Sequence, residues 1–410
     1  MKAPSFLPLL ALIWGTLPAQ ATQTPFSLSV STQTIGGKYQ FTDEPLLVES
    51  AKVIREMGSD TLKITVSKWY PETYHIEERE DIRTALDLIT KEPSYRAVFD
   101  MPFRNTMFWL YPFADQYTAF DTGSIPEEEA EGIYQEIYEV TEYLLKKYSG
   151  TGRHFWIGNW EGDWHMTQVY DYDVDASPAA IKGAIEWFRL REKAVADAKR
   201  ETPHEEVYIH FYVEICHLEK AIEEERPAIV NRVLPHIKTD YVSWSSYDIT
   251  RRAGELGGER GREMVFQALD YIEAHLPESD IEGKRVFIGE YGYKHEWVRD
   301  PDIQEKYTAE LIKWGLEWGC PFILYWQIYC NEFREDLGQH RGFWLINKKG
   351  EKLPVWHLHK NFLTRARTWV DAFQNKKGRM PTQEEYLSVA PDWIQLRDDV
   401  EPAPPIFGPR

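Results

Sequence analysis

The chain has very few cysteines: only Cys216, Cys320 and Cys330 occur in 410 residues. Cys320 and Cys330 lie at the two ends of one predicted strand, where roughly 30 Å of extended chain separates them, so they cannot pair within that strand. We therefore expect no disulfide framework to hold this fold together. Buried free thiols are the predicted state of the cysteines.

Positive charge is also scarce. The 47 Lys and Arg residues are outnumbered by 66 Asp and Glu, which leaves a formal net charge of −19. Proteins that bind nucleic acids carry basic patches that neutralise phosphates, so this balance argues against a nucleic acid partner. It also disfavours anionic membranes and polyanionic substrates, which a positive surface would attract.

Long apolar runs are missing after the N-terminus. Lys2, the apolar residues 6–14 and the small-residue sequence Ala19-Gln20-Ala21 are typical of a secretory signal peptide, here residues 1–21. This run is too short to span a bilayer, and no later segment reaches the necessary ~18 residues. We expect a mature protein that begins near Thr22, is secreted or periplasmic, and is not inserted in the membrane. A buried N-terminal helix is the alternative.

Several catalytic motifs are absent as well. The sequence contains neither the phosphate-binding G-x-x-x-x-G-K-[ST] nor the nucleophile elbow G-x-S-x-G. The first three predicted strands contain no histidine, so the His-x-His pair of a barrel metallohydrolase is missing. Lys63 lies in the middle of a predicted strand without a second cationic neighbour, and we interpret it as a core lysine rather than a Schiff-base former. No metal or other cofactor is expected.

What the sequence does contain is a regular alternation of strand and helix patterns. Strands are predicted over 26–31, 61–67, 95–101, 154–159, 207–215, 241–249, 285–293 and 321–329. Helices are predicted over 44–58, 78–91, 126–148, 178–199, 260–275 and 302–318, and others begin near His217 and Pro354. Alternating strands and helices indicate a parallel sheet, and eight units predict a (β/α)8 TIM barrel.

The competing fold is an open, doubly wound sheet. Such a sheet usually has a glycine-rich phosphate turn after its first strand, and Gly36-Gly37 lack that spacing. We therefore predict one barrel domain over residues 22–375. Residues 376–410 are predicted to be a C-terminal tail that packs on the barrel through Trp393 and ends in a disordered segment.

Two predicted strands end in a glutamate. The sequence IGNWEGDW at 157–164 contains Glu161, and FIGEYG at 287–292 contains Glu290. An unpaired buried carboxylate pays a large desolvation penalty, so its presence at a strand end suggests a functional role. These two glutamates end the fourth and seventh predicted strands. Barrel enzymes form their active sites at the carboxyl ends of the strands. A pair of glutamates there is suited to cleaving a glycosidic bond, with one as acid/base and the other as nucleophile.

This layout resembles clan A of the glycoside hydrolases, which are retaining (β/α)8 enzymes with the acid/base on strand four and the nucleophile on strand seven. FIGEYG is similar to the clan's nucleophile strand, and ILYWQIY followed by GFWLINKKGEKLPVW is similar to its usual ending. The resemblance implies that Glu161 is the acid/base and Glu290 the nucleophile. It also implies that Trp326 lies beneath the scissile sugar and that Tyr247 touches the nucleophile.

The sequence departs from the clan at one position, because Trp160 stands where an asparagine commonly precedes the acid/base. Asn159 lies two residues before Glu161, and in a regular strand both side chains would share a face. We therefore expect Asn159 to reach the sugar 2-hydroxyl. Trp160 and Trp164 are expected to form an apolar wall that raises the pKa of Glu161. A hydrogen bond from Tyr247 is expected to keep Glu290 ionised.

The sequence thus predicts an exported retaining glycoside hydrolase that acts on an oligo- or polysaccharide. The alternative is a non-catalytic carbohydrate-binding barrel; in addition, the two glutamates could be ion-pair partners, and Tyr247 and Trp326 could be core aromatics. Other polar residues also fall near predicted strand ends, and Glu214 is the best reserve carboxylate among them. These residues are Asp100, Arg104, Asn105, Asp163, His165, Glu214 and Glu332.

Overall fold

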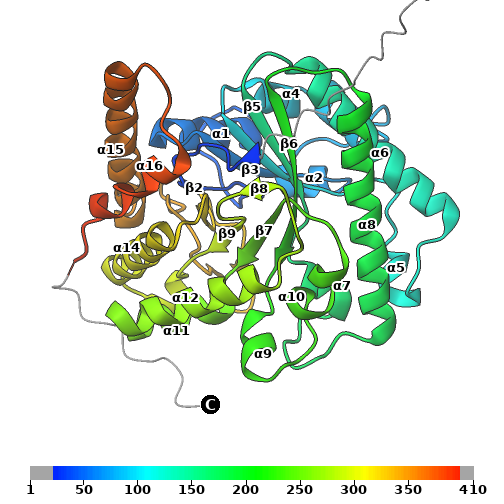
Figure 1. Ribbon diagram of the computed structural model, residues 1–410. Coiled ribbons are helices and arrows are strands. Elements are labelled where there is room, and N and C mark those ends of the chain that lie inside the picture. Colours follow the sequence, from blue (N-terminus) through cyan, green and yellow to red (C-terminus); the bar gives the residue numbers. More distant parts are fainter. Residues whose placement is uncertain (1–21, 398–410) are drawn as a thin grey trace, which may run out of the picture.

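The computed structural model describes residues 22–397 and contains a sheet of eight parallel strands (Figure 1). In chain order these are β2 (Val30–Thr32), β3 (Thr61–Val66), β4 (Asn105–Leu110), β5 (Arg153–Gly158), β6 (Val207–Ile215), β7 (Tyr241–Ser245), β9 (Val286–Tyr291) and β10 (Ile323–Tyr325). Their order in the sheet is β2-β10-β9-β7-β6-β5-β4-β3. A parallel bridge between Gln33 and Lys63 joins the two edge strands. The predicted (β/α)8 barrel is confirmed.

Helices surround the strands (Figure 1). The longer ones are α1 (Leu46–Met57), α4 (Pro93–Asp100), α6 (Glu127–Lys147), α8 (Pro178–Glu201), α11 (Tyr247–Leu256), α12 (Gly258–Ala274), α14 (Pro301–Trp318) and α15 (Pro354–Lys377). Shorter ones include α3 (Ala85–Lys91), α7 (Gly162–Thr167), α9 (Leu218–Glu223) and α13 (His295–Val298). Helix α6 begins after Pro126 with three glutamates in its first turn and ends with Lys146 and Lys147, so both ends complement the helix dipole.

The prediction of a third strand over residues 95–101 is wrong, because this segment is helix α4. Pro93 occupies the first helical position, and the Glu92 carboxylate accepts a hydrogen bond from the backbone N–H of Tyr95 at 2.8 Å. The third barrel strand is β4, in which all six residues are buried. Asp100 therefore ends a helix, and Arg104 and Asn105 stand at the amino end of β4, away from the end where barrel active sites form.

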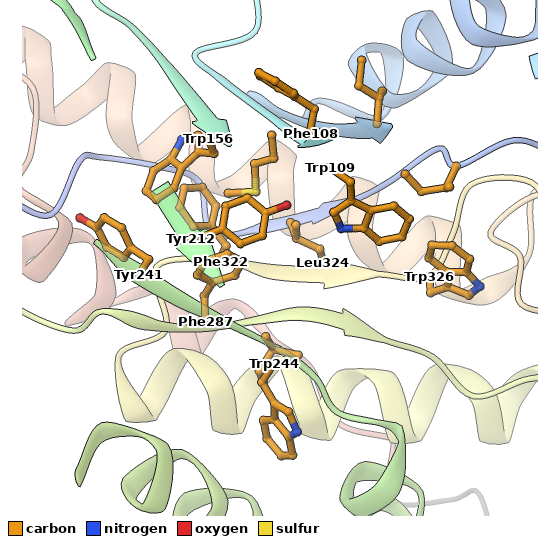
Figure 2. Packing of buried hydrophobic residues seen from close by; sticks show 14 of the residues in the cluster. Phe108, Trp109, Trp156, Tyr212, Tyr241, Trp244, Phe287, Phe322, Leu324 and Trp326 are labelled. Carbon is orange, nitrogen blue, oxygen red and sulfur yellow. The ribbon is translucent and has the colours of Figure 1, made fainter. Parts of the chain in front are cut away.

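Aromatic side chains fill the barrel interior (Figure 2). The Trp156 ring lies 4.9 Å from the Phe322 ring, and Phe322 in turn lies 5.6 Å from Phe287. Gly158 makes room for Tyr212, since a Cβ at this glycine would overlap the tyrosine ring. Figure 2 shows Trp109 and Trp326 at the other end of this packed row. The interior is thus a solid core below the carboxyl ends of the strands.

The segment after α15 packs against the barrel. Helix α16 (Gln383–Leu387) and the 3-10 helix η2 (Ala390–Trp393) follow Lys377. The Trp393 ring lies 5.9 Å from Phe362 on α15, and the Tyr386 hydroxyl donates a hydrogen bond to the carbonyl of Leu28 at 2.8 Å. Packing through Trp393 is therefore seen, and it extends to the chain just before β2. Residues 398–410, where the disordered end was predicted, and residues 1–21 lie outside the described part.

The three cysteines are free and buried, as predicted. Within residues 22–397, no helix combines the length and the apolar character needed to cross a bilayer.

Candidate active site

The two predicted glutamates line one cavity at the carboxyl ends of the strands. Glu290 is the fifth residue of β9, and Glu161 lies in the turn between β5 and α7. The cavity has a volume of about 230 Å³. Its lining residues are Trp160, Glu161, Tyr247, Glu290, Lys294, Trp297, Trp326, Glu332, Arg341 and Phe343. The fold therefore brings Glu161, Glu290, Tyr247 and Trp326 together, although they lie far apart in the sequence.

Glu290 is buried between a phenol and an ammonium group. Tyr247 donates its hydroxyl hydrogen to Glu290 Oε2 at 3.2 Å, and the Nζ of Lys63 lies 3.4 Å from Oε1. Burial raises the pKa of Glu290 to about 8, while the positive charge of Lys63 and the hydrogen bond from Tyr247 act in the opposite direction. Both partners favour the ionised form of Glu290. The expected contact between Tyr247 and Glu290 is present.

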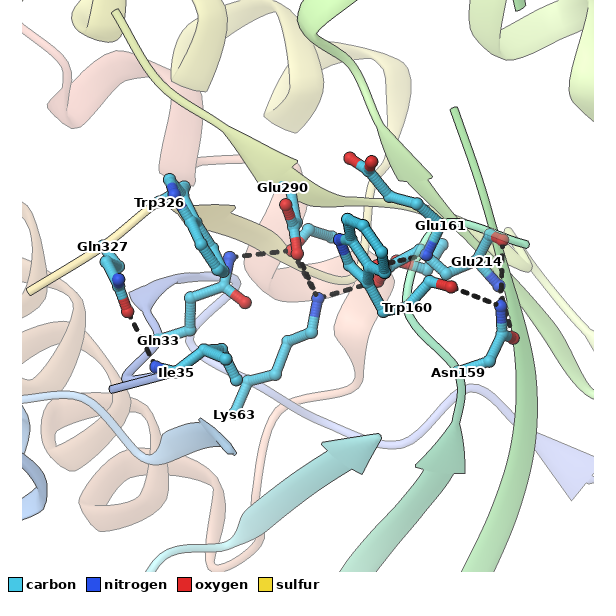
Figure 3. Close-up of polar contacts among 12 residues, drawn as sticks. Gln33, Ile35, Lys63, Asn159, Trp160, Glu161, Glu214, Glu290, Trp326 and Gln327 are labelled. Atoms are coloured by element: carbon cyan, nitrogen blue, oxygen red, sulfur yellow. Dashed lines mark hydrogen bonds and ion pairs between the residues drawn. The ribbon is translucent and has the colours of Figure 1, made fainter. Parts of the chain in front are cut away.

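Lys63 is a site residue that the sequence interpretation missed. It lies on β3 and is fully buried, as expected for a core lysine, but its ammonium group reaches the site. The Nζ donates to Glu214 Oε2 at 2.7 Å and to the carbonyl of Gly289 at 3.1 Å, and it lies 4.7 Å from the centre of the Trp109 ring. Figure 3 shows this group between Glu290 and Glu214. The signal in the sequence that could have identified Lys63 as a site residue is its position in the middle of a largely apolar strand.

Glu214 on β6 connects the two halves of the site. Besides its ion pair with Lys63, it accepts a hydrogen bond from the Ser243 hydroxyl at 2.8 Å. Its other oxygen, Oε1, accepts the backbone N–H of Glu161 at 3.3 Å. One buried carboxylate therefore holds the cation beside Glu290 and the backbone that presents Glu161.

Glu161 has an unusual backbone and an unusual electrostatic environment. Its φ of 21° and ψ of 71° lie outside the regions that side chains with a Cβ prefer, and such strain is found mainly at functional sites. Burial raises the pKa of Glu161 well above its ordinary value, and the negative charges of Glu290 and Glu214 raise it further. Lys63 and Tyr247 bind the Glu290 carboxylate directly. These contacts favour the ionised form of Glu290 more than that of Glu161.

Asn159 does not line the cavity. Its side chain is fully buried, its amide group donates to the carbonyls of Trp160 and Glu214 at 3.2 Å each, and its Oδ1 accepts the backbone N–H of Glu214 at 3.1 Å (Figure 3). The expected approach to a sugar hydroxyl is therefore not supported. Strand β5 ends at Gly158, so the rule that alternate residues share a face no longer applies at Glu161. Asn159 instead fastens the end of β5 to β6.

Trp326 follows β10 and lines the cavity, and it is anchored through its ring nitrogen. Its Nε1 donates to Glu332 Oε1 at 3.1 Å, and Arg341 donates to Glu332 Oε2 at 2.7 Å. The peptide bond between Trp326 and Gln327 is cis. Glu332, one of the polar residues near a predicted strand end, is thus part of the cavity wall.

Charged residues continue this wall. Glu296 accepts hydrogen bonds from Arg334 at 2.8 Å and Arg341 at 3.1 Å, and it forms an ion pair with Lys294 at 2.9 Å. Lys294 is buried, with its Nζ 4.2 Å from the centre of the Trp297 ring. Opposite charges are therefore matched along this side of the cavity.

Two other polar residues near strand ends have structural partners. Asp163 accepts backbone N–H groups of Cys216, His217 and Ile229, and His165 shares a hydrogen bond of 2.9 Å with Tyr111. No group of three or more His, Cys, Asp or Glu side chains within residues 22–397 is arranged to hold a metal ion.

Comparison with known proteins identifies the fold. No protein-family model and no curated protein matches the sequence. A GH5_18 structure from Bifidobacterium longum is 10% identical with a TM-score of 0.55, over 83% of this chain and 79% of that one. A GH5_18 structure from Streptomyces cattleya, in complex with Manβ1-4GlcNAc, is 11% identical with a TM-score of 0.54, over 86% and 82%.

A family 39 glycoside hydrolase from Bacteroides cellulosilyticus is 12% identical with a TM-score of 0.50. The match covers 82% of this chain and 63% of that longer one. At such identities the likeness concerns the fold. The protein has the barrel fold of clan A glycoside hydrolases, as the sequence resemblance implied.

Proposed function

We propose that this protein is a retaining glycoside hydrolase with Glu290 as nucleophile and Glu161 as acid/base. The observation that carries the proposal is the contrast between two buried carboxyl groups in one cavity. Glu290 contacts an ammonium and a phenol that stabilise its anion, whereas burial and then the negative charges of Glu290 and Glu214 raise the pKa of Glu161 well above its ordinary value. Environments that separate the proton affinities of two carboxyl groups assign the acid and the base.

The reaction follows from these roles. Ionised Glu290 attacks the anomeric carbon while Glu161 gives its proton to the oxygen of the departing group, which leaves a glycosyl ester on Glu290. Glu161, now ionised, takes a proton from water as the water oxygen attacks the anomeric carbon and frees Glu290. Lys63 and Tyr247 stabilise the carboxylate before and after attack, and Trp326 offers an apolar face to the sugar ring.

A carbohydrate is the proposed substrate. The aromatic and charged lining of the cavity suits a ligand with apolar C–H faces and many hydroxyl groups. The similar structure from Streptomyces cattleya holds a mannosyl-N-acetylglucosamine disaccharide, which supports the same ligand class here.

The first test is turnover of a panel of aryl glycosides and polysaccharides by wild type, Glu290→Gln and Glu161→Gln. We expect Glu290→Gln to lose activity by at least about 10³-fold, and Glu161→Gln by about 10²–10⁴-fold on substrates whose leaving group needs a proton. Glu127→Gln on the exposed first turn of α6 is the matched control and is expected to behave as wild type. Activity that survives in both site variants would contradict the assignment.

The second test is the stereochemistry of the product, followed by NMR during the first turnover. Retention of the anomeric configuration is expected, because two displacements occur at the same carbon. An inverted first product would remove Glu290 from the role of nucleophile. A wild-type protein that binds sugars and turns none of them over would instead be a non-catalytic carbohydrate-binding barrel.

We also propose that the protein is exported, on the strength of the signal-like residues 1–21. Strand β1 (Thr22–Gln23) pairs with β8 (Ile281–Glu282), so cleavage after Ala21 would leave this pairing intact. Expression of the full chain in a secreting host, followed by N-terminal sequencing, should find Thr22 first. A protein that is retained in the cytoplasm with its first residues present would contradict export.

A further inference from the structure

A second hollow adjoins the catalytic cavity. It has a volume of about 300 Å³, and Trp160 lines both spaces. Its lining residues are Tyr117, Phe120, Asp121, Trp160, Trp164, His165, Gln168, Val169 and Tyr170. Three charged residues of the catalytic cavity do not line the second hollow: Lys294, Glu332 and Arg341. The two neighbouring spaces therefore differ in chemistry: one is charged and the other is mainly aromatic.

One aromatic ring of this hollow is exposed, and the others are half-buried or buried. Tyr170 is 77% exposed, and its ring lies 5.8 Å from Trp160 and 5.5 Å from Trp164. Beside the hollow, the 44% exposed Trp69 stacks on Tyr117 at 6.1 Å. Grouped exposed apolar side chains mark a surface that binds something, since leaving them in water is unfavourable. Flat rings suit the C–H faces of a sugar.

The position of the hollow relative to Glu161 indicates which part of a substrate it would hold. Trp160 and Trp164, which flank Glu161 in the sequence, both line it. Glu161 gives its proton to the oxygen of the departing group, so that group must lie on the side of Glu161. Exposed Asp121 and Gln168 add hydrogen-bonding groups at the same place.

We propose that this aromatic hollow is a leaving-group subsite that binds a sugar ring, so that the substrates are oligosaccharides. This inference rests on the proposed glycosidase function. It assigns Tyr170 the role of a platform for the departing sugar, while the charged cavity holds the sugar that is attacked by Glu290.

The test compares two substrates of the sugar that the aryl glycoside panel selects: its trisaccharide and its glycosyl fluoride. The fluoride has no sugar in the leaving position. For Tyr170→Ala, the ratio of kcat/KM for the trisaccharide to kcat/KM for the fluoride should fall about tenfold, because one stacking contact is lost. Tyr170→Phe keeps the ring and should keep the wild-type ratio. Tyr208→Ala removes a 44% exposed tyrosine on β6 outside the hollow and is the matched control.

The outcomes separate the two proposals. If wild type hydrolyses both substrates and Tyr170→Ala leaves the ratio unchanged, the leaving-group subsite is overturned while the glycosidase function stands. An equal loss on both substrates also overturns it, since the tyrosine would then act through Glu161. If wild type turns over no member of the aryl glycoside panel, so that no sugar is selected, the proposed function fails and the subsite fails with it.

Discussion

The side chain of Glu161 is held where its charged form is disfavoured, and this has a cost in stability. The pKa of Glu161 is raised in the folded protein, so the folded state holds this proton more tightly than the unfolded state does. Well below the ordinary carboxyl pKa both states are protonated and nothing is lost. As pH rises through about 4.5 and beyond, the unfolded state ionises freely while the folded state does not, so stability falls.

Glu161→Gln is therefore expected to raise the melting temperature at pH 7–8 by about 2–5 °C, because the neutral amide removes this cost. The difference from wild type should shrink toward zero near pH 4, where the wild-type carboxyl is protonated in both states. Calorimetry across this pH range measures it. A melting temperature that falls at pH 7 in the variant would show that the carboxyl is stabilising rather than costly.

Two neighbours of Glu290 are expected to move its titration in opposite directions. The positive charge of Lys63 lowers the pKa of Glu290, and the negative charge of Glu214 raises it. On the acid side, activity is lost as the nucleophile becomes protonated. Lys63→Met should therefore move the acid limb of the kcat/KM profile to higher pH, and Glu214→Gln should move it to lower pH.

Lys63→Met is also expected to cost about 3–5 kcal/mol of stability, because it leaves two buried carboxylates without their counter-charge. Glu214→Gln keeps a hydrogen-bond acceptor for Ser243 and gives the complementary variant. Profiles measured on folded protein at 25 °C distinguish the charge effect from unfolding. Shifts of the same sign in both variants would contradict the electrostatic account.

At the scale of single elements, the sequence predicts the number of strand–helix units better than it predicts which segment forms each strand. Seven of the eight strand positions follow from runs of strand-forming residues, but residues 95–101 alternate in the same way and form α4. The signals that favour the helix are Pro93 and the capping carboxylate of Glu92. The true strand, β4, is buried on both faces, so after Asn105 and Thr106 it continues as an unbroken apolar run over residues 107–110 rather than an alternating one.

Helix α8 fastens the two strands that carry one side of the site. Arg191 is fully buried, and its Nη2 donates to the carbonyl of Leu110 at 2.6 Å and to that of Gly158 at 3.0 Å. These carbonyls end β4 and β5, and the turn with Glu161 begins just after Gly158. The guanidinium also lies 4.2 Å from the centre of the Trp187 ring. One side chain thus fixes the base of the Glu161 turn.

Arg191→Met is expected to lower the free energy of unfolding by about 2–4 kcal/mol, since two buried carbonyls lose their donor. It should also lower kcat more than it changes KM, because the Glu161 turn loses its anchor. Denaturant unfolding and steady-state kinetics measure both effects. Arg189→Met, an exposed arginine on the same helix, is the matched control and should cost less than about 1 kcal/mol. Equal effects in the two variants would contradict the anchoring role.

At the scale of the whole molecule, the eight strand–helix units predicted from the sequence are enough to place Glu161 and Glu290 at one end of the barrel. Tyr247 and Trp326 could be placed there for the same reason, because each follows a strand. The contacts of Lys63 and Glu214 could not be predicted in this way. Which interior residues meet depends on the stagger between strands, and that register comes from packing across the barrel rather than from any one segment.

The C-terminal segment was predicted to be a tail that packs on the barrel. In the structure it also forms hydrogen bonds to the chain just before the first barrel strand, β2. Strand β2 is short, and the chain just before it is held by residues about 350 positions away. Gln383 Oε1 accepts a hydrogen bond from the backbone N–H of Ser27 at 2.9 Å, and the Tyr386 hydroxyl donates one to the carbonyl of Leu28. Tyr386 is fully buried, with its ring 5.5 Å from Trp393. We therefore expect barrel closure to depend on the segment that follows α15.

Two substitutions at one position test this dependence. Tyr386→Phe should cost about 1 kcal/mol, the worth of one hydrogen bond, and Tyr386→Ala about 3–5 kcal/mol, because a cavity replaces a buried ring. Exposed Leu396→Ala in the same segment is the control and should be nearly neutral. Unfolding should remain one transition in all variants, since the segment belongs to the barrel core. A separate early transition, or a neutral Tyr386→Ala, would mean that residues 382–393 are a dispensable appendage and that β2 closes the barrel without them.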